Sequence, residues 1–112
     1  MKTELKEGET IIKEGLGNLQ RGIETVGGKL YLTNRRLIFE AHSFNIQSGT
    51  SEIPLSFVQD MRKCWTKLLG FLPIMPNSLA VHTTDGKEYR FVIFRRSAWM
   101  QAINEQKAAE SG

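Results

Sequence analysis

Short apolar runs that alternate with polar residues dominate the chain between residues 9 and 94, and they predict a sheet of antiparallel strands. In residues 9–21 the apolar pieces are broken by Gly15 and Gly17. Because glycine interrupts regular structure and the apolar pieces between the glycines are short, this stretch favours a pair of short strands over a helix.

Residues 27–42 have the clearest hairpin pattern. Leu30 and Leu32 alternate with less apolar residues, the letters TNRR interrupt the run, and LIFEA resumes it. We expect Asn34 to adopt the positive φ that tight turns require, because asparagine tolerates that conformation better than most residues.

The stretch that follows, residues 51–66, mixes two kinds of pattern. Ile53, Leu55 and Phe57 alternate with other residues at first, and the alternation is then lost. We expect a strand near 51–55, a turn or single helical turn at LSFVQD, and a further strand near 59–66.

A second hairpin is expected over residues 77–94, and its register can be argued. A two-residue loop at Asp85 and Gly86 would send the apolar side chains of the two strands to opposite faces. A three-residue loop over 84–86, with Gly86 in the left-handed region, keeps them on one buried face. The cross-strand pairs in this register are Val81 with Tyr89 and Leu79 with Phe91.

The period changes after residue 96, where Ser97 is a suitable N-cap and AWMQAINEQKAA contains neither Gly nor Pro. This predicts an amphipathic helix of about three turns, with Trp99 plugging the open end of a curved sheet. The predicted core residues are Ile12, Leu30, Leu32, Leu37, Phe39, Leu79, Val81, Tyr89, Phe91, Trp99 and Ile103.

The order of these elements and the wording of several segments resemble the GRAM domains of the pleckstrin-homology-like superfamily. The matching text is GGKLYLTNRRLIFEA at 27–41, IPLSFVQDM at 53–61 and LAVHTTDGKEYRFVIFRRSAW at 79–99. The resemblance implies a mainly β (α+β) fold: a pleckstrin-homology-like split barrel of about seven antiparallel strands, capped by one C-terminal helix. The short chain is similar to stand-alone bacterial members, so we expect one domain over 1–112 with flexible ends at about 1–8 and 108–112.

Such domains are generally binding modules for membrane lipids or proteins, and a shared fold does not choose between these partners. In phosphoinositide-binding pleckstrin-homology domains, the loop joining the first two strands usually carries several Lys and Arg. The corresponding stretch here, KEGLGNLQRG, has Lys13 and Arg21 but also Glu14, and no tight basic cluster. Headgroup recognition at the usual place is therefore not indicated.

Composition narrows the classes of function. The 112 residues carry a net charge of only +3, with 15 basic against 12 acidic residues, which offers no electrostatic stripe for a nucleic acid. Cys64 is alone, and neither a signal peptide nor an apolar run approaching about 18 residues is present. We therefore expect a cytoplasmic location, with a peripheral contact to the membrane as one alternative.

Signatures of catalysis and of metal binding are nearly absent. His42 and His82 have no Cys, Asp or His at metal-ligand spacing, so we expect surface or sheet-edge histidines and no metal. The letters GLGN at 15–18 lack the third glycine and the following helix of a dinucleotide site. We expect no cofactor and no enzymatic activity.

The most informative segment is KLLGFLPIMPN, residues 67–77, where an apolar run follows basic residues. Basic residues beside exposed apolar ones are the usual ingredients of a peripheral membrane contact. Three interpretations stay open: core or strand extension, a patch for a protein partner or a homodimer, and a membrane contact. The candidate lipid- or partner-binding residues are Arg62, Lys63, Lys67, Leu68, Phe71 and Leu72.

Overall fold

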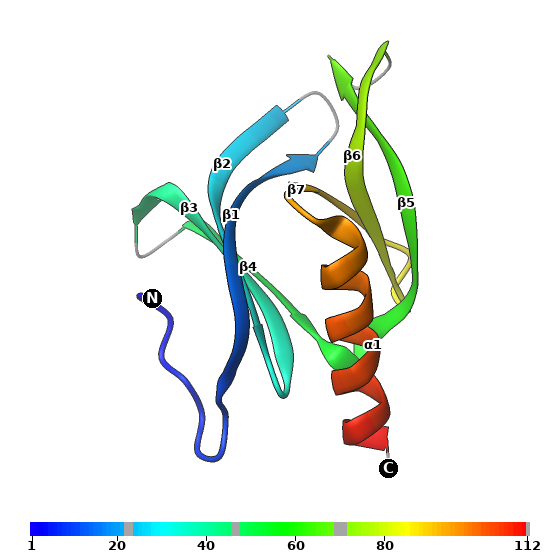
Figure 1. Ribbon diagram of the computed structural model, residues 1–112. Helices are drawn as coiled ribbons and strands as arrows, with labels where there is room; N and C mark the ends of the chain where they lie inside the picture. Colours follow the sequence, from blue (N-terminus) through cyan, green and yellow to red (C-terminus); the bar gives the residue numbers. More distant parts are fainter. Residues whose placement is uncertain (22–23, 46–47, 69–71, 112) are drawn as a thin grey trace.

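The computed structural model describes residues 1–21, 24–45, 48–68 and 72–111 (Figure 1). Within these residues, seven strands form one antiparallel sheet and a C-terminal helix packs against it. The strands are β1 (Ile11–Arg21), β2 (Glu24–Thr33), β3 (Arg36–Asn45), β4 (Ser48–Pro54), β5 (Val58–Leu68), β6 (Leu72–Thr83) and β7 (Glu88–Ile93). The single-turn 3₁₀ helix η1 (Leu55–Phe57) precedes β5, and helix α1 (Arg96–Ser111) follows β7.

The strand order is β4-β3-β2-β1-β7-β6-β5, so β7 returns to pair with β1 and the sheet curls into a split barrel. Its two edges are β4 and β5. The β1–β7 ladder pairs Gly17 with Ile93, and a Cβ at Gly17 would lie 2.7 Å from the carbonyl oxygen of Val92. The predicted split barrel with a C-terminal helical cap is confirmed.

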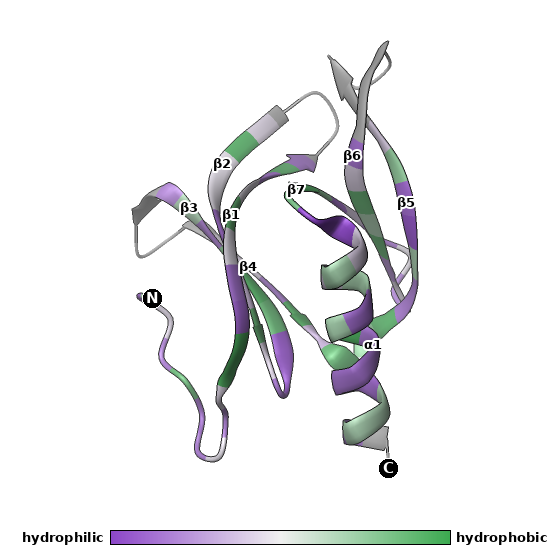
Figure 2. Ribbon diagram, viewed as in Figure 1, coloured by the Kyte–Doolittle hydropathy of each residue, from purple (hydrophilic) through white to green (hydrophobic). Residues whose placement is uncertain are grey.

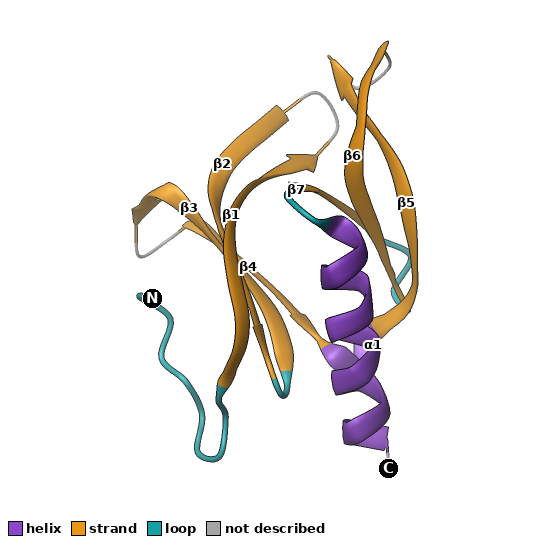
Figure 3. Ribbon diagram, in the orientation of Figure 1, coloured by secondary structure: helices purple, strands orange, loops and turns teal. Residues whose placement is uncertain are grey.

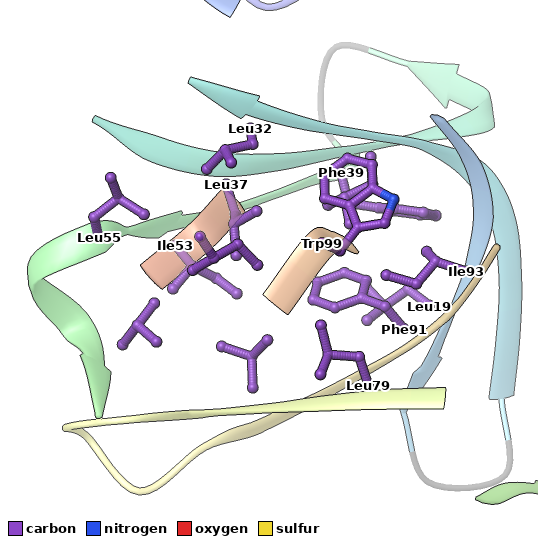
Figure 4. Close-up of a cluster of buried hydrophobic side chains, with 14 of the residues drawn as sticks. Leu19, Leu32, Leu37, Phe39, Ile53, Leu55, Leu79, Phe91, Ile93 and Trp99 are labelled. Atoms are coloured by element: carbon purple, nitrogen blue, oxygen red, sulfur yellow. The ribbon is translucent and has the colours of Figure 1, made fainter. Parts of the chain in front are cut away.

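The core lies between the curved sheet and α1 (Figure 4). Hydrophobic residues recur along the strands (Figure 2). Most of the buried ones form one cluster with Trp99 and Ile103 of the helix. Trp99 is only 3% exposed, as expected for the residue that plugs the barrel. Its packing neighbours in the core include Phe39, Phe91 and Ile93.

Two core predictions need correction. Ile12 is 44% exposed, because the β1–β2 register shifts between Ile11 and Lys13 and the shift turns Ile12 away from the core. The ammonium of Lys13 lies over the ring of Trp99 instead, 5.4 Å from its centroid. Tyr89 is only partly buried and packs at the margin of the core.

The first strand is continuous, so the expected pair of short strands is wrong. Gly15 and Gly17 lie inside β1, because the missing side chains make room for other groups. A Cβ at Gly15 would lie 3.4 Å from the ring of Trp99. Lys13 and Glu14, which were expected in a loop between strands, therefore belong to β1, and Glu14 pairs with Lys29 at 2.8 Å.

The first hairpin forms as predicted, with a different turn. Asn34 does not have a positive φ, since Arg95 is the one non-glycine residue of the described chain that does. The Asn34 side chain holds the turn by hydrogen bonds instead. It accepts from the N–H of Thr10 at 2.9 Å and donates to the carbonyl of Gly8 at 3.1 Å.

The β6–β7 hairpin confirms the predicted register. Val81 pairs with Tyr89 and Leu79 with Phe91, and Gly86 has a φ of +84°. The N–H of Thr83 donates to the carbonyl of Lys87 and closes the three-residue loop.

Helix α1 is longer than expected, at 16 residues, because its sequence holds no Gly or Pro before Gly112. It begins at Arg96, so Ser97 lies in the first turn and is not the N-cap. The first turn is closed by N–H groups of Ala98 and Trp99, which both donate to the carbonyl of Arg95.

Residues 1–9, which we call the strap, have no regular structure but are held to the sheet (Figure 3). Figure 1 shows the strap on the side of the sheet away from α1. The carboxylate of Glu9 accepts hydrogen bonds from the Arg36 guanidinium at 2.9 and 3.0 Å and from the Thr33 hydroxyl at 2.6 Å. The side chain of Glu9 is fully buried, so this ion pair anchors the strap beneath the surface.

Candidate functional site

The segment singled out from the sequence lies in the β5–β6 hairpin. β7 pairs with β6 only from Ser78 to His82, whereas β5 pairs with β6 as far as Leu72. The hairpin therefore extends past β7 as a two-stranded ribbon, which Figure 1 shows projecting from the barrel. Of the three interpretations of the apolar run, a strand extension describes the backbone of residues 67–68 and 72–77, which lie in β5 and β6.

The structure describes only part of the predicted site. Arg62 and Lys63 are exposed on β5. Arg62 pairs with Ala80 and Lys63 with Leu79, so these neighbours lie on opposite faces of the sheet rather than on one patch. Lys67 and Leu68 close β5 and Leu72 opens β6, with side chains outside the described part of the chain, and Phe71 lies outside the described residues altogether.

A feature that sequence reasoning missed stands at the junction of β7 and α1. Phe94 is 83% exposed there, and the next residue, Arg95, has a φ of +59°. The two residues border an open hollow of about 510 Å³, whose walls also include Asn77 of β6 and the first turn of α1. An aromatic ring, a guanidinium and a concave surface thus meet at one corner of the barrel.

Arg96 fastens this corner to the base of the ribbon. Its Nη1 donates to the carbonyl oxygens of Cys64 at 2.8 Å and of Ser78 at 3.1 Å. These bonds lie where the β5–β6 register shifts after Cys64, so Arg96 has a structural role.

An exposed leucine extends the same surface. The β1–β7 ladder ends at Gly17 and Ile93, and continuing its register sets Leu16 beside Phe94. Leu16 is 68% exposed. We define the corner patch as Leu16, Phe94 and Arg95. The letters FRRS at 94–97 did not indicate that Phe94 is exposed, because alternation of apolar and polar residues does not distinguish Phe94 from other strand residues.

A charged cluster crosses β5, β6 and β7 on the outer face. His82 Nδ1 contacts Asp60, and its Nε2 lies 2.8 Å from Glu88. The hydrogen bond to Asp60, followed by that to Glu88, raises the pKa of His82. The partners escaped sequence reasoning because they come from neighbouring strands. Over the residues that the structure describes, no cluster of His, Cys, Asp and Glu has the geometry to hold a metal ion.

The His82 cluster is expected to make stability depend on pH. Because the folded-state pKa of His82 is raised, its charge stabilises the fold fully below about pH 6.5, and this contribution is lost as pH rises through the folded-state value. The free energy of unfolding of the wild type, relative to that of His82→Gln, should therefore fall between pH 5.5 and pH 8.5, measured by urea denaturation at several pH values.

His42 offers a matched control, since it is exposed and makes none of these contacts. His42→Gln, measured alongside, controls for the loss of a histidine side chain as such. A difference between wild type and His82→Gln that stays constant with pH would contradict the role assigned to Asp60 and Glu88.

The chain belongs to the GRAM domain family, whose model matches residues 1–106. None of the curated proteins compared with it matches. Among solved structures, the C-terminal domain of an unknown protein from Leishmania infantum is similar, with a TM-score of 0.74 and 17% identity over 91% of this chain and 87% of that one. The Vps36 N-terminal PH domain is similar with a TM-score of 0.70 and 17% identity, over 95% of this chain and 84% of that one.

These comparisons show the family and the pleckstrin-homology-like fold. GRAM and pleckstrin-homology-like domains are generally non-catalytic modules that bind lipids or proteins. Among the described residues, no helix is both long enough and apolar enough to cross a membrane.

Proposed function

We propose that this chain is a non-catalytic module that binds an anionic membrane surface through the corner patch. The observation that carries the proposal is Phe94, which is 83% exposed beside Arg95 at the rim of a hollow. An aromatic side chain so exposed does nothing for the core, whereas aromatic and basic residues together suit a lipid interface.

The chemistry of the hollow fits a phosphate-bearing headgroup. Arg95 supplies a planar guanidinium, which pairs well with phosphate oxygens, and Asn77 also lines the hollow. Phe94 and Leu16 would enter the interfacial layer while Arg95 stays with the headgroups. We therefore propose an anionic phospholipid, bound peripherally, as the ligand. We also propose that the protein acts in the bacterial cytoplasm.

The expected affinity is modest. Arg95 contributes about 1 kcal/mol near an anionic surface, and burial of Phe94 and Leu16 contributes up to about 3–6 kcal/mol together. The sum does not exceed the ~8 kcal/mol of a micromolar complex even before ordering costs. Binding should therefore be reversible and should weaken as salt is raised.

Co-sedimentation with vesicles tests the proposal. The wild type should bind vesicles containing anionic phospholipid at low salt and bind them less at physiological salt. It should not bind neutral vesicles. Phe94→Ser and Arg95→Asn should each lower the bound fraction at least about threefold, in line with the loss of about 1 kcal/mol or more. Asparagine suits position 95 because it removes the charge and accepts a positive φ.

Matched controls come from the other end of the barrel. Phe57 on η1 is 46% exposed and Arg35 is an exposed arginine, so Phe57→Ser and Arg35→Gln should bind like the wild type. A parallel variant, Lys63→Glu with Lys67→Glu and Phe71→Ser, tests the ribbon residues predicted from the sequence. Equal binding by the Phe94, Arg95 and control variants would refute the corner patch.

A protein contact is the second candidate, and the unpaired edge of β5 favours self-association as its simplest form. It becomes the better proposal if no vesicle composition binds the folded wild type. Light scattering after size-exclusion chromatography would then show a dimer, and Phe71→Asp would separate it if the 68–75 run is buried between the copies.

A further inference from the structure

The outer face of β2 and β3 is buried although it faces away from the core. Tyr31 and Ile38 pair across these strands and are 5% and 0% exposed, yet neither belongs to the core cluster. Because side chains alternate along a strand, Ile38 shares its face with Arg36 and Glu40. Both of these neighbours are bonded to the strap, which therefore crosses the sheet over Ile38.

The side chain of Glu40 binds the backbone of the strap. Its carboxylate accepts hydrogen bonds from the N–H of Lys2 at 3.0 and 3.1 Å, from the N–H of Thr3 at 2.6 Å and from the Thr3 hydroxyl at 2.6 Å. Burial alone would raise the pKa of Glu40, but the bonds from Thr3 and Lys2 outweigh it and the pKa is lowered. Glu40 is thus an ionised, 8% exposed acceptor aimed at an extended segment.

The second anchor is Arg36. Its guanidinium donates hydrogen bonds to the carboxylate of Glu9 and, through Nη2, to the carbonyl of Glu4 at 3.0 Å. Apart from Glu9, which is buried, the strap is at least partly exposed. The strap is therefore held to the sheet by a few charge-assisted hydrogen bonds rather than by the burial of a large apolar area. Such a segment can open locally while the barrel stays folded.

We propose that the outer face of β2 and β3 is a second docking surface, for an extended peptide segment, and that the strap is its resident, displaceable occupant. The fitting partner carries a Ser or Thr hydroxyl and two backbone N–H groups that bind Glu40, as Thr3 and its neighbour do in the strap. About six residues later it carries a carboxylate that binds Arg36, as Glu9 does. This surface is separate from the corner patch, and the proposal does not depend on lipid binding.

Native-state hydrogen exchange on the intact chain is the first test. The amides of Lys2 and Thr3 should be protected relative to a free peptide, but at least a hundredfold less than the amides of Leu32 and Leu79. Glu40→Gln should speed exchange of the strap amides at least tenfold and leave Leu79 unchanged.

Glu14→Gln is the matched control, because Glu14 is an exposed carboxylate that bonds Lys29 rather than the strap. It should leave the exchange of the strap amides unchanged. Strap amides that exchange as slowly as those of the core, or that show no protection in the wild type, would overturn the proposal.

Binding in trans is the second test. A labelled peptide of residues 1–9 should bind the chain that lacks residues 1–9, and Glu40→Gln in that chain should weaken its affinity at least tenfold. Failure of the peptide to bind a truncated chain that circular dichroism shows to be folded would overturn the docking surface. If truncation prevents folding, the exchange measurement on the intact chain decides.

Discussion

Replacing Arg36 with methionine is expected to destabilise the fold by about 3–5 kcal/mol, the cost of leaving a buried charge without its partner. Arg36 is 9% exposed at its side chain, and Glu9 not at all. The guanidinium also bonds Glu52 and the carbonyl of Glu4, so the substitution removes several charge-assisted hydrogen bonds at once. Urea denaturation at pH 7, followed by circular dichroism, measures the change.

The pH dependence provides a second readout of the same pair. Burial alone would raise the pKa of Glu9, but the bonds from Arg36, from the N–H of Lys6 and from Thr33 outweigh it and lower the pKa to about 2. A lowered carboxylate pKa stabilises the fold above its unfolded value of 4.5, and this contribution is lost as pH falls toward 2. The wild type should therefore lose stability over this interval, and Arg36→Met should lose much less.

Arg35→Met is the control, since the neighbouring arginine is exposed and its guanidinium donates to the carbonyl of Glu7 at the long distance of 3.4 Å. It should change the free energy of unfolding by no more than about 0.5 kcal/mol. Replacing both members of the pair, with Glu9→Leu and Arg36→Met, should recover part of the loss. A loss below about 1 kcal/mol for Arg36→Met alone would show that the ion pair is not the anchor of the strap.

Trp99→Ala is expected to cost about 3–5 kcal/mol, as a large buried side chain removed from a packed core does. Trp99 is 3% exposed, it closes the barrel between the two halves of the sheet, and Gly15 leaves room for its ring. Alanine would leave a cavity that neither the sheet nor α1 can close without breaking other contacts. The same denaturation measurement, followed by far-ultraviolet circular dichroism, gives the difference.

Trp65→Ala is the natural comparison, because it deletes the same side chain at a position that is 50% exposed. The expected change there is about 0.5 kcal/mol or less. Similar losses for the two variants would mean that Trp99 does not close the core.

Much of the architecture could be predicted from the local pattern of apolar residues and from the residues that form turns. The β6–β7 register followed from two facts, that Gly86 accepts a positive φ and that a two-residue loop would divide the apolar side chains between faces. Both are properties of neighbouring residues, so they could be read without the structure. The helix could be read in the same way, apart from its length and first residue.

The errors have a common cause. Gly15 and Gly17 look like strand breakers, but they lie in a continuous strand because Trp99 and Val92, about 80 residues away, occupy the space of the missing side chains. Ile12 has the composition of a core residue and is exposed because a register shift turns it outward. No local pattern contains either fact.

The sequence by itself determined the family, the hairpins, the helical cap and most of the core, because these depend on alternation and on turn residues close together in the chain. Only the tertiary structure decided the candidate surfaces. It separated Arg62 from Lys63 by strand geometry and set Phe94 and Arg95 beside a hollow. It also laid the strap over Glu40, almost 40 residues away in sequence. Burial and charge pairing at such separations depend on how the sheet curls, which no single segment encodes.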